Sequence, residues 1–425
     1  MTAGTRFRIF VQPPYVPGFE QPVTIYVDTG SDPIEPGPAD PLLYVLDAEN
    51  KPGYRAEAPH EAQRFRGRPW RGSVNPHTAG PNPDGHFDHL EPHDPAFPAA
   101  SVYATARHVL NFWNRVFADG GVGKITAWHH DPEALRAEGE DQFPDRLQLI
   151  PRSASAGARA GYGYVELGRD NPGHRYRGGR DGSPRRIYQR GAMWQNFDVI
   201  AHEVGHAILF RKIGFPDAAR GKRDWFDFPD PEFLAFHESM ADLMAILALL
   251  DIKEARQHIL MRRGGLDVIA GVGELQKVNH TGFLPIRSAL NTAEFPGGGA
   301  QLDNRQAHEN SMPLTAAVFA ALGEVYRAYA DSSAKSSPAP DLDQALNDAH
   351  DVVARALARL WSTPDFLWED PESRSQLRFA KIAEHLPKLV VNEVAAHSPY
   401  QAGDQPLIAE SDIVKHFEQR NLRRR

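Results

Sequence analysis

The chain has 425 residues, of which 41% are hydrophobic, and it contains no cysteine. A chain of this length can bury a large core in about two or three domains, while the missing thiols exclude disulfides and leave histidine and carboxylate as ligands for any zinc. The formal net charge of -8 gives no electrostatic reason to expect a nucleic acid or an anionic membrane as partner.

The N-terminal part of the chain contains short alternating or β-branched runs, RFRIFVQ at 6–12 and PVTIYVD at 22–28, separated by turns rich in proline and glycine. Such runs predict strands. Residues 75–98 are so rich in Pro, Gly, Asp and His that a regular element is not expected there. We therefore predict a β-rich N-terminal module over residues 1–96.

Histidines and aspartates gather in the segment HFDHLEPHD at the end of this module. They are His86, Asp88, His89, His93 and Asp94. The cluster could bind a second metal ion, or it could be a solvated polar loop. We favour the loop, because the surrounding prolines and glycines provide no helical or strand spacing that would aim these side chains at one ion.

A helix is predicted over residues 100–121, where apolar residues recur at helical spacing before a glycine pair. Strands are predicted at 146–153 and 162–167. The arginines between 175 and 190 form a loop that could hold an acidic substrate, although a solvated loop is the simpler interpretation. We expect a second domain over residues 97–213, which includes the helix discussed below.

Helical signals dominate from residue 214 to the end of the chain. The clearest is an apolar stripe that repeats every three or four residues along 342–360. Further helices are predicted around 313–330, 374–396 and 408–421. The fold class is therefore α+β, with a β-rich front half and a mainly helical third domain over residues 214–425.

The segment HEVGH contains two histidines, His202 and His206, four residues apart in an otherwise apolar run. On a helix their imidazoles lie on one face and can converge on one metal ion, with Glu203 beside them. A catalytic zinc site uses three protein ligands and keeps a further position for water, so a third ligand is required. The alternative is a pair of core histidines with satisfied hydrogen bonds.

The third ligand is sought on another element. A histidine six residues after His206 is absent, because that position is Lys212. The segment FHESMADLMAILALL offers Glu238 and Asp242, which are four residues apart on a strongly predicted helix. Carboxylates on such an apolar helix need a partner, because burying an unpaired charge costs several kcal/mol. A zinc ion and its ligands would be that partner.

The pair HEVGH and ESMAD resembles the glutamate-zinc metallopeptidases, the gluzincins, and in particular the thermolysin-like group. The resemblance implies that Glu238 is the third zinc ligand and that Asp242 accepts a hydrogen bond from His202. It also implies a two-lobed catalytic unit, in which a β-rich N-lobe and a mainly helical C-lobe meet at a cleft that holds the zinc helix. Residues 1–96 would be an additional module.

Two further segments are similar to motifs of the same group and follow in the same order along the chain. The segment DNRQAHENSMP implies that His308 donates a hydrogen bond to the developing oxyanion and that Asp303 orients His308. The segment PIRSAL implies that Arg287 binds the substrate backbone. Asp198, four residues before His202, fits the family pattern and would serve equally well as a helix N-cap.

The sequence departs from the family at two points. No tyrosine shortly precedes Glu238 to act as a second oxyanion donor, so transition-state stabilisation would depend more on His308. Leu249 stands eleven residues after Glu238 in place of an acid. Asp198 alone does not rebuild the calcium cluster of the family, and a calcium requirement is therefore doubtful.

These motifs predict a zinc metalloendopeptidase with one zinc per chain, in which Glu203 is the general base and His308 stabilises the oxyanion. The expected partner is a peptide or protein substrate. Two alternatives remain open: a thermolysin-like binding protein with little or no catalysis, and an exopeptidase of the wider gluzincin group. The sequence does not predict an oligomeric state.

The location of the protein is predicted from its apolar runs. The first ten residues lack an apolar core of signal-peptide length, and the longest apolar run, MADLMAILALL, is interrupted by Asp242 and too short to cross a bilayer. We expect a cytoplasmic protein without a membrane anchor. A removed leader or another export route stays open.

Overall fold

The computed structural model describes residues 4–14, 16, 18–48, 78–128, 146–161, 163–169, 192–213, 231–263, 288–296, 302, 306–336, 341–362, 379–400 and 406–423. The chain divides into two units. One comprises Met1–Asn111, Ile125–Gly214 and Leu275–Pro285, and the other comprises Phe112–Lys124, Phe215–Glu274 and Ile286–Arg425. The first contains small sheets and the second is mainly helical, which confirms the α+β class in its general form.

Two small sheets lie in the first unit. In one, β1 (Thr5–Ile9) pairs antiparallel with β2 (Val23–Val27), as the runs at 6–12 and 22–28 predicted. The other has the strand order β3-β4-β6-β5. Its strands are β3 (Leu43–Val45), β4 (Leu147–Ala156), β5 (Ala158–Gly161) and β6 (Tyr164–Arg169). β4 is parallel to β3 and β6, whereas β5 is antiparallel to β6 and forms an edge of the sheet.

The first long helix, α2, spans Phe97–Asp119 and contains most of the helix predicted at 100–121. Val102, Tyr103 and Ala106 are fully buried, as their helical spacing requires. The helix ends at the glycine pair, where Gly121 has a φ of 75° and the Val122 amide donates to the Phe117 carbonyl. A positive φ costs little for glycine, so this residue pair can end the helix.

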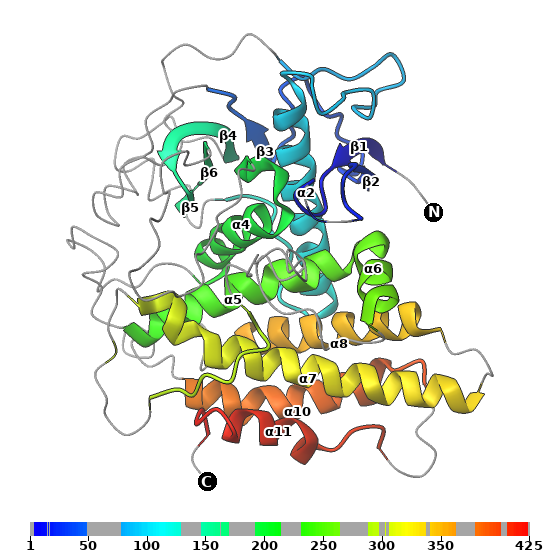
Figure 1. Cartoon of the computed structure of the whole chain (residues 1–425), viewed down its shortest axis with the longest axis vertical. Helices are drawn as coiled ribbons and strands as arrows, with labels where there is room; N and C mark the ends of the chain where they lie inside the picture. The colour runs from blue at the N-terminus through cyan, green and yellow to red at the C-terminus, as the bar shows by residue number, and fades with distance from the viewer. Residues whose placement is uncertain are drawn as a thin grey trace, which may run out of the picture. The chain divides into compact units, whose positions relative to one another are not determined.

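The second unit contains a group of packed helices. They are α5 (Pro231–Leu250), α6 (Lys253–Arg263), α7 (Ala307–Ser336), α8 (Leu342–Ser362), α10 (Phe379–His397) and α11 (Glu410–Glu418). α7 packs against α5, α8 and α11, and α10 packs against α8 (Figure 1). Ala345, Leu346, Ala349, Val352, Val353, Ala356, Leu357 and Leu360 are buried, which confirms the stripe predicted along 342–360.

Helix α5 is mostly apolar and has a mean hydropathy of 1.6 over its most apolar window. By length and composition it could cross a membrane, but that entire window is buried inside the protein. The core helix of a soluble protein is buried in the same way. The apolarity of α5 alone therefore does not indicate a membrane span.

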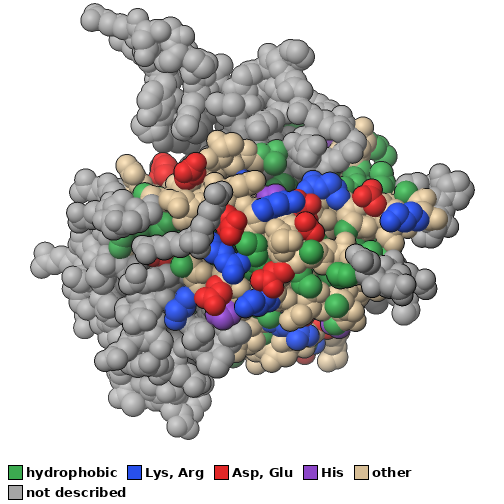
Figure 2. All heavy atoms as spheres, turned by 90° about the horizontal axis from the view of Figure 1, so that it is seen from below, with side chains coloured by type: hydrophobic (Ala, Val, Ile, Leu, Met, Phe, Trp, Pro, Cys, Tyr) green, Lys and Arg blue, Asp and Glu red, His purple; other side chains and the backbone are tan. Residues whose placement is uncertain are grey.

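An ionic cluster holds α11 against α7. Glu324 on α7 lies 3.0 Å from Arg327 Nη2, 3.0 Å from Lys415 Nζ and 2.8 Å from His416 Nε2. Burial alone would raise the pKa of Glu324, but hydrogen bonds from Lys415, His416 and Arg327 lower it to about 2. Figure 2 shows that acidic and basic side chains are interspersed on the face seen there.

A buried histidine, His350 on α8, lies among charged groups. Its Nε2 is 3.9 Å from Asp251 Oδ1 and 3.7 Å from Asp351 Oδ1, and Arg115 contacts both aspartates. Burial lowers the pKa of His350 below its ordinary 6.5; the two aspartates oppose this shift, and Arg256 and Arg115 add to it. The folded protein therefore holds this imidazole neutral where an unfolded chain would protonate it.

This difference predicts a loss of stability in acid. The contribution of His350 is complete above the ordinary histidine pKa and is lost as the pH falls from that value toward the lowered pKa of the folded state, by up to about 1.4 kcal/mol per pH unit. We expect the urea midpoint of His350→Gln to fall less than that of the parent between about pH 7 and about pH 5. The control is His93→Gln, because the His93 side chain is 83% exposed. The prediction is contradicted if the urea midpoint falls equally with decreasing pH in the parent, His350→Gln and His93→Gln.

Candidate metal centre

Helix α4 (Phe197–Lys212) carries the HEVGH segment, and residues 197–210 are all buried. Asn196 is the N-cap, and its side chain accepts a hydrogen bond from the Val199 amide at 3.4 Å. Asp198 is therefore not the cap. It lies in the first turn, where Gln12 Nε2 donates to its Oδ1 at 3.1 Å. The N-terminal segment thus contacts the helix one turn before His202.

The two histidines of α4 lie on one face, as their spacing predicted. Their ring centroids are 4.5 Å apart and their planes meet at 83°. His202 is 5% exposed and His206 is 9% exposed. The pair is therefore largely shielded from water but still accessible at its edge.

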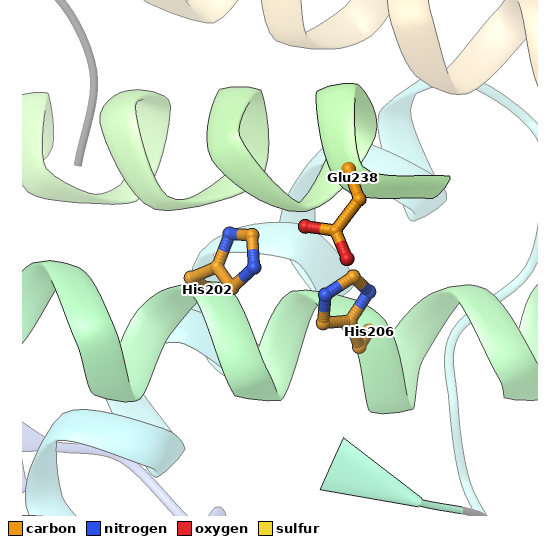
Figure 3. A group of neighbouring side chains, drawn as sticks. All are labelled: His202, His206 and Glu238. Atoms are coloured by element: carbon orange, nitrogen blue, oxygen red, sulfur yellow. The ribbon is translucent and has the colours of Figure 1, made fainter. Parts of the chain in front are cut away.

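Glu238 on α5 joins the two histidines. One ligand atom from each of His202, His206 and Glu238 lies within 4.8 Å of the other two. Figure 3 shows the Glu238 side chain directed toward both imidazoles. The three residues form a buried group that could bind a metal ion. Two imidazole nitrogens and one carboxylate oxygen are a donor set that fits a catalytic zinc ion, because zinc accepts both atom types and such sites use three protein ligands.

His308 lies next to this group. It is in the first turn of α7, and its Nε2 is 3.1 Å from Glu238 Oε2. The His308 side chain is 52% exposed, whereas that of Glu238 is 9% exposed. The ring of His308 is thus open to solvent, whereas the Glu238 carboxylate beside it is largely shielded.

The remaining predicted residues have different outcomes. Asp242 is one turn after Glu238 on α5 and only 2% exposed, and its hydrogen bond to His202 stays a prediction. Asp303 and Arg287 lie outside the described residues. Leu249, where the family carries an acid, is a buried apolar residue on α5.

Glu203 follows His202 in α4 and is 8% exposed. The nearby strand β6 carries Tyr164, which is 3% exposed. Burial raises the pKa of the Tyr164 phenol well above its ordinary value; Glu166 and, more weakly, Glu203 raise it further. Glu203 is therefore close enough to affect this hydroxyl. Sequence analysis missed Tyr164 as a neighbour of Glu203, because only the packing of α4 on β5 and β6 relates the two.

The HFDHLEPHD segment is held by bonds to β1 rather than arranged around an ion. The Arg6 amide donates to His86 Nδ1 at 3.3 Å, and Arg6 Nε donates to Asp88 Oδ2 at 2.7 Å. Asp94 accepts from the Glu91 amide. In the described part of the chain, the group on α4 and α5 is the one that could bind a metal.

No protein-family model matches this chain, and no curated protein matches it either.

Proposed function

We propose that the protein is a zinc-dependent metalloendopeptidase of the thermolysin-like type. The observation that supports this most is the approach of Glu238 to His202 and His206 in one buried group, with Glu203 in the same helix turn. Two core histidines would not require a carboxylate from another helix. Because Glu203 is not part of the predicted ligand set, it is available for proton transfer.

The finer architecture belongs to the same proposal. We infer a thermolysin-like catalytic unit in which α2, β4, β5, β6 and α4 form the β-rich lobe and α5 to α11 form the helical lobe, with residues 1–96 as an additional module. Both halves of the inference are supported by the secondary structure of the two units. The hydrogen bond between Gln12 and Asp198 further suggests that the N-terminal residues stabilise the zinc helix.

Residues of this chain would perform the proton transfers. When bound, zinc would supply Lewis acidity, polarising the scissile carbonyl and lowering the pKa of water to about 7. The Glu203 carboxylate would take a proton from the attacking water and deliver it to the leaving amine nitrogen. No covalent enzyme intermediate is needed, because water forms the new bond to the carbonyl carbon.

His308 would stabilise the negative charge that develops on the carbonyl oxygen. A donor aimed at this oxygen contributes about 3 to 4 kcal/mol, or roughly a hundred- to a thousandfold in rate. The half-exposed ring beside Glu238 is suited to this role, because it is accessible and lies at the metal group. The substrate backbone could pair with the edge strand β5, which packs against α4.

The proposal is tested by digesting a diverse peptide library with the zinc-loaded protein and identifying the products by mass spectrometry. We expect internal cuts and no cuts after zinc is removed with 1,10-phenanthroline; the resemblance to the thermolysin-like group further implies a large apolar residue just after the cut. Products trimmed only at chain ends would favour an exopeptidase. A protein that binds zinc but gives no products would contradict catalysis and favour a binding protein.

A further inference from the structure

A buried hydroxyl bridge joins the helix of Glu238 to the helix of His308. Ser239 follows Glu238 on α5 and is fully buried, and Thr315 on α7 is 3% exposed. Thr315 Oγ1 lies at hydrogen-bond distance, 2.9 Å, from Ser239 Oγ. Among the helix pairs of the second unit, α5 and α7 are packed against each other most extensively.

The same bridge continues to the backbone of His308. Thr315 Oγ1 is 3.3 Å from the Ser311 carbonyl oxygen, and Ser311 Oγ donates to the His308 carbonyl at 2.7 Å. Ser311 is fully buried. Three hydroxyls therefore connect the neighbour of Glu238 to the residue whose ring contacts the Glu238 carboxylate.

The start of α7 needs such support because Pro313 lies inside the helix. Proline has no amide proton, so the bond from residue 313 to the Glu309 carbonyl is missing, and the ring crowds that carbonyl. The turn that carries His308 is therefore weakly held by its own backbone. The Ser311 hydroxyl bonds the His308 carbonyl in this turn, and the Thr315 hydroxyl ties the following turn to Ser239 on α5.

The bridge also sets the relative position of the two helices. Apolar packing of α7 on α5 tolerates small shifts, whereas a hydroxyl pair loses its bond when the oxygens separate by more than a few tenths of an ångström. Losing it would deprive the buried Ser239 hydroxyl of this partner, at a cost of about 1 to 3 kcal/mol, while Thr315 Oγ1 would keep the Ser311 carbonyl. The bridge thus favours the alignment of α7 on α5 in which His308 lies beside Glu238 over alignments in which the two helices are slightly shifted.

We propose that Ser239 and Thr315 are positioning residues that hold His308 at the metal group. This inference rests on the proposed peptidase function, because the position of His308 matters for catalysis only if His308 acts on the substrate. The bonds that define the bridge run between the two hydroxyls and to the Ser311 carbonyl, so in this proposal both residues act through the helices that they join.

The test compares three variants for kcat, KM and backbone hydrogen exchange. Thr315→Val keeps the shape and removes the hydroxyl, Thr315→Ser keeps the hydroxyl, and Thr105→Val makes the same exchange at another buried threonine, 1% exposed, on α2. We expect Thr315→Val to lower kcat about tenfold, with KM within about twofold, because a displaced His308 would lose only part of the roughly hundred- to thousandfold that one oxyanion donor contributes. Exchange in residues 306–316 of the metal-free protein should rise. The other two variants should resemble the parent.

Several results would overturn the inference. Unchanged kcat in Thr315→Val would do so even if exchange rises, because the bridge would then stabilise the helix without positioning His308. An equal loss of kcat in Thr105→Val or Thr315→Ser would show a general effect of substitution. Unchanged exchange would show that the bridge does not hold the turn. A parent that neither binds zinc nor cleaves peptides contradicts the proposed function instead, and zinc affinity, measured by chelator competition, identifies that case.

Discussion

Glu203→Gln is expected to abolish peptide hydrolysis while zinc stays bound. The amide keeps the size of the side chain but cannot accept a proton from water, so the general-base contribution of about a hundred- to ten-thousandfold is lost. Zinc should be retained, because the predicted ligands are His202, His206 and Glu238. The measurement is kcat/KM on a peptide from the library digest, with metal analysis of the same preparation.

The matched control for this variant is Glu254→Gln, which makes the same change at an exposed glutamate in the first turn of α6. It should keep the activity and zinc content of the parent. If Glu203→Gln cleaves as fast as the parent, the proposed proton transfer is wrong even if the protein is a peptidase. Loss of zinc in Glu203→Gln would instead indicate that this carboxylate helps to bind the metal.

The second large effect is expected from the metal ligands. The purified parent should contain about one zinc per chain, and His202→Ala or Glu238→Gln should lose both the metal and the activity. Removing one of three ligands should weaken zinc binding by more than the roughly 10- to 100-fold typical of outer partners. Asp242→Asn, which alters a predicted outer partner, should fall within that smaller range.

The control is His93→Ala, because this histidine is exposed and lies outside the metal group. It should bind zinc like the parent. If Glu238→Gln still binds one zinc per chain, Glu238 is not the third ligand, and the main support for the proposed function is lost. Loss of zinc in His202→Ala but not in Glu238→Gln would indicate a metal site on α4 that does not use Glu238.

Most elements of the fold were predictable because their patterns are local. The alternating runs at 6–12 and 22–28 became β1 and β2, and the apolar stripe along 342–360 became the buried face of α8. Boundaries were less predictable. Helix α7 begins at Ala307, before the predicted residue 313, and its interior contains Pro313. Proline disfavours a helix interior, but here the Ser311 and Thr315 hydroxyls bond the nearby His308 and Ser311 carbonyls.

The sequence by itself determined the pair His202 and His206, because a helix repeat places residues four apart on one face whatever surrounds them. It also predicted Glu238, through resemblance and through the cost of burying a carboxylate. The Ser239–Thr315 bridge and the bond between Gln12 and Asp198, which are 186 residues apart, have no local signal. They depend on how whole helices and strands pack, and the free energy of that packing is shared among many distant residues. Only the tertiary structure could therefore decide them.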